Sequence, residues 1–185
     1  QRHPDSYLTH DCPLSIHPTN HVPGIEVCTG ALGHGFSVAV GMALAAQRSH
    51  RTYRTFVLTG DGELEEGTNW EAAMSAAYYK LGNLTVIVDN NRLQLADTVS
   101  HTMEIEPLAD KFKAFGFDTH ETDGHDIGTL AALFESFDYA QDKPHAVIAH
   151  TIKGKGVSFA ENVVEWHHRI PTPEEGAAAL KELEK

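Results

Sequence analysis

The sequence contains few cysteines and few basic residues. Its two cysteines, Cys12 and Cys28, lack the CxxC spacing of a zinc or dithiol site, so we expect two reduced thiols in an intracellular protein. Lysine and arginine number 14 against 26 aspartates and glutamates, which gives a formal net charge of −12. Because such a surface repels polyphosphate backbones, nucleic acid is not expected as a partner.

Long hydrophobic runs are also absent. The longest weakly polar run, Phe36 to Ala46, holds 11 residues, whereas a membrane-spanning helix needs about 20. No signal peptide pattern is present, so we expect a cytoplasmic protein without a membrane partner. A chain of 185 residues with 41% hydrophobic residues can bury one core, and we expect a single domain over residues 1–185.

Helical and strand patterns alternate along the chain. Segments with apolar residues at helical spacing alternate with short runs that are β-branched or wholly apolar. Because strands separated by helices pair in parallel, the pattern predicts an α/β fold, a parallel sheet with helices on both faces. Residues 1–34 and 152–171 are loop-rich. The expected helices are 35–47, 70–81, 108–115, 126–137 and one from Thr172, and the expected strands are 54–59, 84–88, 117–122 and 145–151.

Three of these helices carry more specific predictions. Met74 and Tyr78 fall on one helical face with other apolar residues of 70–81, so we expect both to be buried. Asp126 is expected to cap a helix that turns Ile127 inward. Thr172, followed by proline and two glutamates, has the form of a capping box.

Polar residues follow two predicted strands at the point where each ends. Gly60-Asp61-Gly62 follows the first, and Asp89-Asn90-Asn91 follows the second. Asn91 lies 30 residues after Asp61, about one strand-helix-strand crossover, so both can meet at the carboxyl edge of the sheet, where ligands bind. Carboxylate and amide oxygens suit Mg²⁺, and the glycines let a diphosphate approach the backbone. The alternative is a plain turn at Gly60-Asp61-Gly62.

These runs resemble the transketolase family. A GDG run followed about thirty residues later by NN resembles the thiamine diphosphate signature of transketolases, 2-oxo acid dehydrogenases and related enzymes. The runs at 17–45, 60–73, 80–95 and 152–167 resemble transketolase in particular. The resemblance covers nearly everything from about residue 7 onward, and it implies the thiamine diphosphate-binding fold of the diphosphate-binding type.

The resemblance also implies a cofactor site. It places Mg²⁺, or another divalent cation such as Ca²⁺ or Mn²⁺, on Asp61, Asn91 and the backbone oxygen of Leu93. The residues that it assigns to thiamine diphosphate are Gly30, Ala31, Leu32, Asp61, Gly62, Glu63, Asn91 and His167.

Two histidines and two glutamates receive further roles from the resemblance. His17 matches a catalytic histidine near the thiazolium ring, and His167 one that reaches both diphosphate and substrate. His3 is also followed by proline, but only His17 leads into the Gly30 turn at the expected spacing, so we expect His17 on the side of Asp61 and His3 at the periphery. Glu66 and Glu71 resemble acidic residues at the family's dimer interface.

The implied activity is transfer of a two-carbon ketol unit from a ketose phosphate to an aldose, as in the pentose phosphate pathway. The pyrimidine-binding domain and an upstream histidine motif of the family are not found in the sequence. We therefore expect a split enzyme, a dimer of pairs with a C-terminal subunit that carries the pyrimidine domain. The alternatives are a fragment of a longer transketolase, a deoxyxylulose phosphate synthase-like or 2-oxo acid dehydrogenase-like subunit, or a non-catalytic cofactor-binding remnant. His34 and His168 depart from the family pattern and bear on substrate choice.

Overall fold

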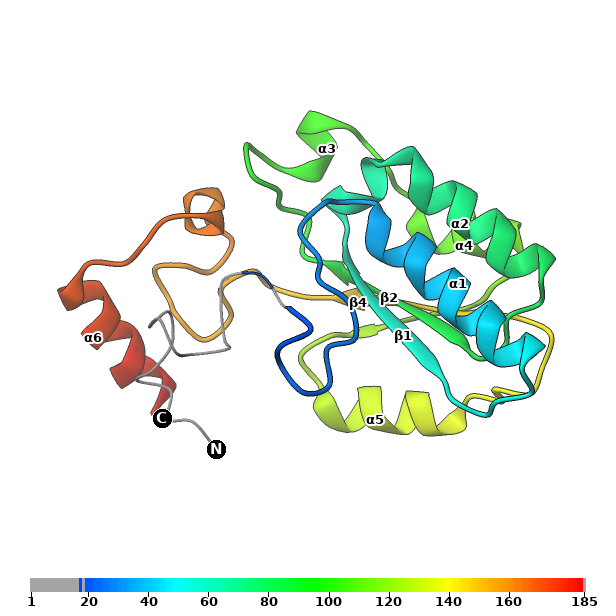
Figure 1. Cartoon of the computed structure of the whole chain (residues 1–185). Helices are drawn as coiled ribbons and strands as arrows, with labels where there is room; N and C mark the ends of the chain where they lie inside the picture. Colours follow the sequence, from blue (N-terminus) through cyan, green and yellow to red (C-terminus); the bar gives the residue numbers. More distant parts are fainter. Residues whose placement is uncertain (1–16, 18, 185) are drawn as a thin grey trace.

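A computed structural model describes residues 17 and 19–184. None of the helices within that part of the chain is long and apolar enough to cross a membrane. The α-helices are α1 (His34–Arg48), α2 (Gly67–Tyr78), α3 (Val99–Thr102), α4 (Leu108–Phe115), α5 (Ile127–Ser136) and α6 (Pro173–Leu183) (Figure 1). The short 3-10 helices are η2 (Gly62–Glu65) and η3 (Val164–His167). The strands are β1 (Thr55–Gly60), β2 (Leu84–Asn90), β3 (Asp118–Asp123) and β4 (His145–His150).

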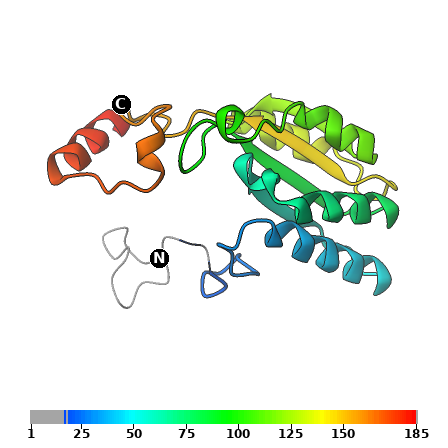
Figure 2. The same ribbon diagram turned by 90° about the horizontal axis from the view of Figure 1, so that it is seen from above.

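The strands form one parallel sheet in the order β1-β2-β4-β3. Helices α1, α2 and α4 cover one face of the sheet and α5 covers the other, as Figures 1 and 2 show. The prediction of a parallel α/β sheet with helices on both faces is therefore confirmed. Each expected helix and strand forms within a few residues of its predicted bounds, whereas the short α3 was not predicted.

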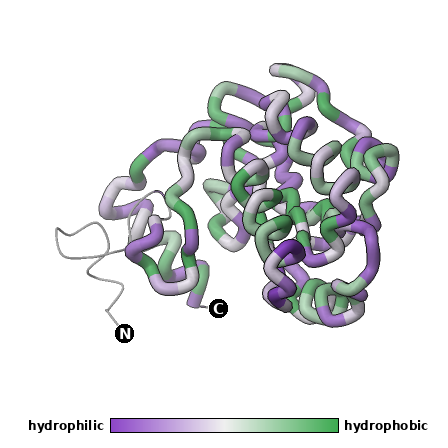
Figure 3. Tube along the Cα trace, turned by 45° about the vertical axis from the view of Figure 1, so that its right-hand side comes forward, coloured by the Kyte–Doolittle hydropathy of each residue, from purple (hydrophilic) through white to green (hydrophobic). Residues whose placement is uncertain are grey.

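The main core lies between the sheet and helices α1, α2 and α4, which cover one of its faces. Phe36 of α1, Phe112 of α4 and Leu84 of β2 are fully buried there. Removing one such side chain from water stabilises a fold by about 1.5–3 kcal/mol. Figure 3 shows hydrophobic stretches within the packed body of sheet and helices and many hydrophilic stretches in the segment that carries α6.

The buried face of α2 differs from the predicted one. Met74 is 53% exposed and Tyr78 is 79% exposed, so the prediction that both are buried is wrong. The buried positions of α2 are instead Asn69, Ala72, Ala73 and Ala76. Small alanine side chains let α2 pack closely between α1 and α4, and this packing turns the larger apolar residues outward.

The caps of the last two helices agree with the sequence, but one inward residue does not. The Asp126 side chain accepts hydrogen bonds from Thr129, and Thr172 forms a reciprocal capping box. Ile127 is 74% exposed, so its predicted inward position is wrong. The first turn of α5 follows β3 at the carboxyl edge, where the strands end, and α5 reaches the sheet through Phe134, whose ring meets that of Phe56 edge-on at 6.0 Å.

A buried histidine begins β4, at the amino ends of the strands and therefore opposite the carboxyl ends that carry Asp61 and Asn91. The His145 ring is fully buried and stacks on Phe137, with ring centroids 4.1 Å apart. Its Nδ1 lies 3.4 Å from Asp118 Oδ2 without a well-aligned hydrogen bond. Burial lowers the pKa of His145 below its ordinary value of 6.5, and the Asp118 carboxylate opposes this shift without reversing it.

We expect this histidine to make stability fall in mild acid. Above pH 6.5 His145 is neutral in both the folded and the unfolded chain. As the pH falls from there through the lowered folded pKa, only the unfolded chain readily binds the proton, so the free energy of unfolding decreases. Urea unfolding of His145→Gln should show a shallower loss between pH 7 and 5 than the unmutated chain. Equal slopes for the two proteins would contradict the prediction.

Candidate functional site

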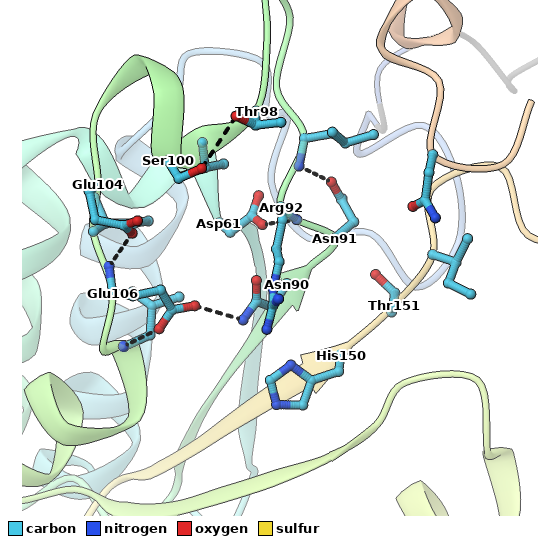
Figure 4. Close-up of a pocket in the computed structure, with 16 residues that line it drawn as sticks. Asp61, Asn90, Asn91, Arg92, Thr98, Ser100, Glu104, Glu106, His150 and Thr151 are labelled. Carbon is cyan, nitrogen blue, oxygen red and sulfur yellow. Dashed lines mark hydrogen bonds between the residues drawn. The ribbon is translucent and has the colours of Figure 1, made fainter.

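The ends of β1 and β2 bring Asp61 and Asn91 to neighbouring positions. Gly60 pairs in register with Asp89, and the Asp61 backbone N–H donates to the Asp89 carbonyl at 3.2 Å. The Asp61 carboxylate accepts hydrogen bonds from the backbone N–H groups of Gly62, at 2.8 Å, and Arg92. The carboxylate that directly follows β1 thereby accepts a hydrogen bond from the residue that directly follows Asn91 (Figure 4).

A cavity of about 730 Å³ opens beside these strand ends. All three predicted metal ligands line it, as do residues of the 90–108 segment and of the chain that follows β4. Its lining comprises Asp61, Asn90, Asn91, Arg92, Leu93, Thr98, Val99, Ser100, Glu104, Ile105, Glu106, Leu108, His150, Thr151, Ile152 and Asn162. His17, His167 and residues 30–32 are not among them.

The electrostatics of Asp61 suit a bound cation. Its side chain is 2% exposed, and burial raises its pKa above 3.8, although N–H groups of Arg92 and Gly62 oppose the shift. The neighbouring Asp89 carboxylate raises the pKa further. No described lysine, arginine or histidine forms an ion pair with Asp61, so a buried negative charge lacks a counterion that a divalent cation would supply.

The three predicted metal ligands, Asp61, Asn91 and the Leu93 carbonyl, are all oxygen donors. Within residues 17 and 19–184, no three His, Cys, Asp or Glu side chains gather as a metal cluster. A cation here would therefore combine the Asp61 carboxylate with the Asn91 amide oxygen and the Leu93 carbonyl. Hard cations such as Mg²⁺ accept this kind of mixed oxygen set and complete it with phosphate and water.

Gly33, at the start of α1, is clamped to the segment that follows β1. Its N–H donates to Glu63 Oε1 at 3.0 Å, and its carbonyl accepts from Thr68 Oγ1 at 2.9 Å. Glu63 Oε2 also accepts from the Gly60 N–H at 3.3 Å. These contacts hold the Gly30-Ala31-Leu32 turn near the end of β1. They also use both oxygens of the Glu63 carboxylate, which the resemblance assigns to the cofactor, as acceptors of backbone hydrogen bonds.

We expect Gly33→Ala to loosen this clamp. Gly33 has φ 79°, and a Cβ there would lie 2.5 Å from Thr68 Oγ1 and 2.8 Å from Glu66 Cβ. The left-handed backbone alone costs an alanine about 1–2 kcal/mol, so the free energy of unfolding should fall by at least that amount. Gly41→Ala is the matched control, because its Cβ meets nothing within 4 Å in α1 and should stabilise by up to about 1 kcal/mol. An equal change in the free energy of unfolding for Gly33→Ala and Gly41→Ala, measured with urea, would refute the role of these contacts.

The two predicted catalytic histidines lie in separate segments of the chain. The His17 ring lies 3.8 Å from the position that a Cβ on Gly30 would take, and His3 lies outside the described residues. His167 ends η3, and burial lowers its pKa below 6.5, with help from the charges of Lys153 and His168. The catalytic roles of both histidines stay predictions.

Two contacts at the strand ends went unnoticed in the sequence. The Thr151 hydroxyl donates to the Asp89 carboxylate, and the Asn90 amide donates to Glu106 at 3.1 Å. Thr151 ends the predicted strand 145–151, so the rule that found Asp61 could have marked Thr151 as a strand-end residue, whereas its contact with Asp89 depends on β4 lying next to β2.

Comparisons with known proteins agree with this architecture. A family profile described as "Transketolase, thiamine diphosphate binding domain" matches residues 6–183. The chain is 51% identical over 170 residues to an apulose-4-phosphate transketolase subunit of Phocaeicola vulgatus, covering 92% of this chain and 60% of the relative. It is 43% identical over 162 residues to a 6-deoxy-6-sulfo-D-fructose transketolase subunit of Clostridium sp., covering 88% of this chain and 59% of the relative.

Among solved structures, transketolase from Campylobacter jejuni superimposes with a TM-score of 0.79 at 29% identity, covering 85% of this chain and 26% of that one. The chain thus spans about 60% of the length of the relative from Phocaeicola vulgatus. The family match extends over most of the sequence and includes both strand ends of the site. The chain belongs to the transketolase family.

Proposed function

We propose that the chain is the diphosphate-binding subunit of a split, cytoplasmic transketolase. In this role it works with thiamine diphosphate and Mg²⁺ to transfer a two-carbon ketol unit from a ketose phosphate to an aldose acceptor. The observation that carries the proposal is the position of Asp61 and Asn91 at the ends of two paired strands, beside one cavity.

Asp61, Asn91 and the Leu93 carbonyl would hold the cation, and the cation would bind the cofactor's diphosphate. Gly62 would meet the diphosphate through its backbone, because the position has no side chain: a Cβ there would lie 3.0 Å from Gln94 Cβ. The Gly30-Ala31-Leu32 turn would lie along the cofactor. When bound, thiamine diphosphate would supply the carbanion chemistry that ketol transfer requires.

The chain's own contribution to the chemistry would be proton transfer and charge. His167 is held neutral near pH 7 by its lowered pKa, which burial and the Lys153 ammonium cause, so its ring can accept a proton. His17, whose ring lies beside Gly30, would act near the thiazolium ring. Lys153 would add local positive charge for an anionic substrate in a chain of net charge −12.

The names of the relatives bear on the substrate class. One names apulose-4-phosphate and another names a 6-deoxy-6-sulfo sugar. Both sugars carry an anionic group, and we extend this property to the donor of the present chain. A partner protein with the pyrimidine-binding domain would complete each active site, in a dimer of such pairs, with Glu66 and Glu71 at the contact.

The test is ketol transfer by the chain reconstituted with a pyrimidine-domain subunit, Mg²⁺ and thiamine diphosphate. Donors would be a set of ketose phosphates and a sulfonated ketose, and release of the shortened aldose would be measured. Transfer from at least one donor supports the proposal. Cofactor binding without any transfer would favour a non-catalytic remnant, and use of pyruvate with glyceraldehyde phosphate would favour a deoxyxylulose phosphate synthase-like enzyme.

A further inference from the structure

Asp89 lies at the carboxyl end of β2 and connects the strands on both sides. In the sheet register it stands between Gly60 of β1 and Ala149 of β4. Its Oδ1 accepts hydrogen bonds from Asn91 Nδ2, at 3.3 Å, and from the Thr151 hydroxyl. Its backbone carbonyl accepts from the Asp61 N–H at 3.2 Å. One residue therefore contacts both proposed side-chain ligands of the cation.

The contact with Asp89 fixes the orientation of the Asn91 amide. An amide nitrogen only donates and an amide oxygen only accepts. Nδ2 faces the Asp89 carboxylate, and Oδ1 accepts from the Leu93 N–H at 2.9 Å. A flipped amide would set its oxygen against the carboxylate and its NH₂ group against an N–H. The amide oxygen is thereby kept toward Leu93, the third proposed ligand.

Asp89 also adds negative charge without a neutralising partner. It is partly buried, and no described lysine, arginine or histidine forms an ion pair with it. The Thr151 hydroxyl holds its carboxylate in place from the chain after β4. Asp61 and Asp89 together therefore present two negative charges at one strand edge, which matches the charge of a divalent cation.

We infer that Asp89 is a positioning residue that sets the affinity of this site for its divalent cation, by orienting the Asn91 amide oxygen and by supplying a second carboxylate charge. The inference rests on the proposed function, because that function places the cation on Asp61 and Asn91. Asp89 itself does not touch the cation, and it acts through Asn91 and through its charge.

The test is a calorimetric titration of the full chain with Mg²⁺, in the presence of thiamine diphosphate at a fixed concentration, which measures the affinity for Mg²⁺. Asp89→Asn keeps an oxygen that can accept from Thr151 and Asn91 but removes the charge. Mutation of a residue that hydrogen-bonds to a metal ligand weakens metal binding by about 10- to 100-fold, and we expect the Mg²⁺ affinity of Asp89→Asn to fall within this range. Asp110→Asn, an exposed carboxylate on α4, is the control and should keep full affinity.

Thermal unfolding without cation separates this role from a merely structural one. Because Asp89→Asn removes repulsion with Asp61, its cation-free melting temperature should equal or exceed that of the unmutated chain. A lower melting temperature with unchanged Mg²⁺ affinity would overturn the inference. Thr151→Val, which leaves the charge and frees the carboxylate, should weaken Mg²⁺ binding by about 10-fold. Unchanged affinity in both variants would likewise overturn it, whereas an unmutated chain that binds no Mg²⁺ would overturn the cation site itself.

Discussion

Asp61→Asn is expected to abolish Mg²⁺-dependent binding of thiamine diphosphate while the fold persists. The substitution removes the one buried carboxylate of the proposed ligand set and leaves an amide of nearly the same shape. Outer partners of a metal site already change affinity by about 10- to 100-fold, so loss of a charged ligand should exceed about 100-fold. Calorimetry of cofactor binding, with Mg²⁺ and with EDTA, measures the effect.

The free energy of unfolding should fall by less than about 3 kcal/mol in this variant, so the chain stays folded, and this separates a ligand role from a structural one. Because the substitution keeps one oxygen, the new amide can still accept from the Gly62 N–H, but the Arg92 N–H loses its carboxylate partner. An unmatched N–H costs about 1–3 kcal/mol, and relief of an unpaired buried charge offsets part of it.

The matched control is Asp123→Asn at the end of β3. This residue lies at the same edge of the sheet but does not line the Asp61 cavity. It should bind the cofactor as the unmutated chain does. Retention of Mg²⁺-dependent binding by the Asp61 variant would refute the proposed site, and so would an equal loss in the Asp123 variant.

The pairing of β1 with β2 was accessible from the sequence because it depends on local patterns. A wholly apolar run at 84–88 indicates a strand buried on both faces, and one crossover of 30 residues brings the ends of consecutive parallel strands together. The same reasoning could not supply the contact between Asp89 and Thr151. It depends on β4 lying next to β2 with β3 at the edge, an order that does not follow the sequence.

The orientation of α2 was misjudged for a related reason. Alanines and larger apolar residues occur all around this helix, so its sequence alone does not distinguish the face that meets its neighbours. Packing against α1 and α4 selects the alanine face, and Met74 and Tyr78 lie outside. An apolar face that the described residues leave uncovered is itself informative, because large apolar patches on proteins often mark interaction sites.

The second expected result concerns the exposed face of α2 that carries Glu71, Met74 and Tyr78. We expect a partner subunit to bind this face, and we expect ketol transfer to depend on that binding. Glu71, Met74 and Tyr78 follow one another at helical spacing and are all exposed. Glutamates near the start of a helix also favour its dipole, so charge alone does not identify an interface. The apolar Met74 and Tyr78 beside Glu71 have no such explanation within the described chain.

Met74→Glu should therefore weaken association with the pyrimidine-domain subunit. A side chain central to an interface contributes about 2 kcal/mol or more, so the dissociation constant should rise by at least about 30-fold. Ile127→Glu is the matched control, since Ile127 is also an exposed apolar residue, at 74%, but lies on α5 across the sheet. Sedimentation with the partner protein measures both variants, and equal losses would refute an α2 interface.

Activity should follow association, because the diphosphate site holds only one end of the cofactor. The reactive ring must be shielded from water and positioned, and a misplacement of about 1 Å costs on the order of 100-fold in rate. The isolated chain with Mg²⁺ and thiamine diphosphate should then bind cofactor but show no measurable ketol transfer, and adding partner should restore it. Met74→Glu should need more partner for the same rate yet reach the same maximum, since Met74 lies outside the reacting centre. Full turnover by the isolated chain would refute the split enzyme, even if Asp61 proves to hold the cation.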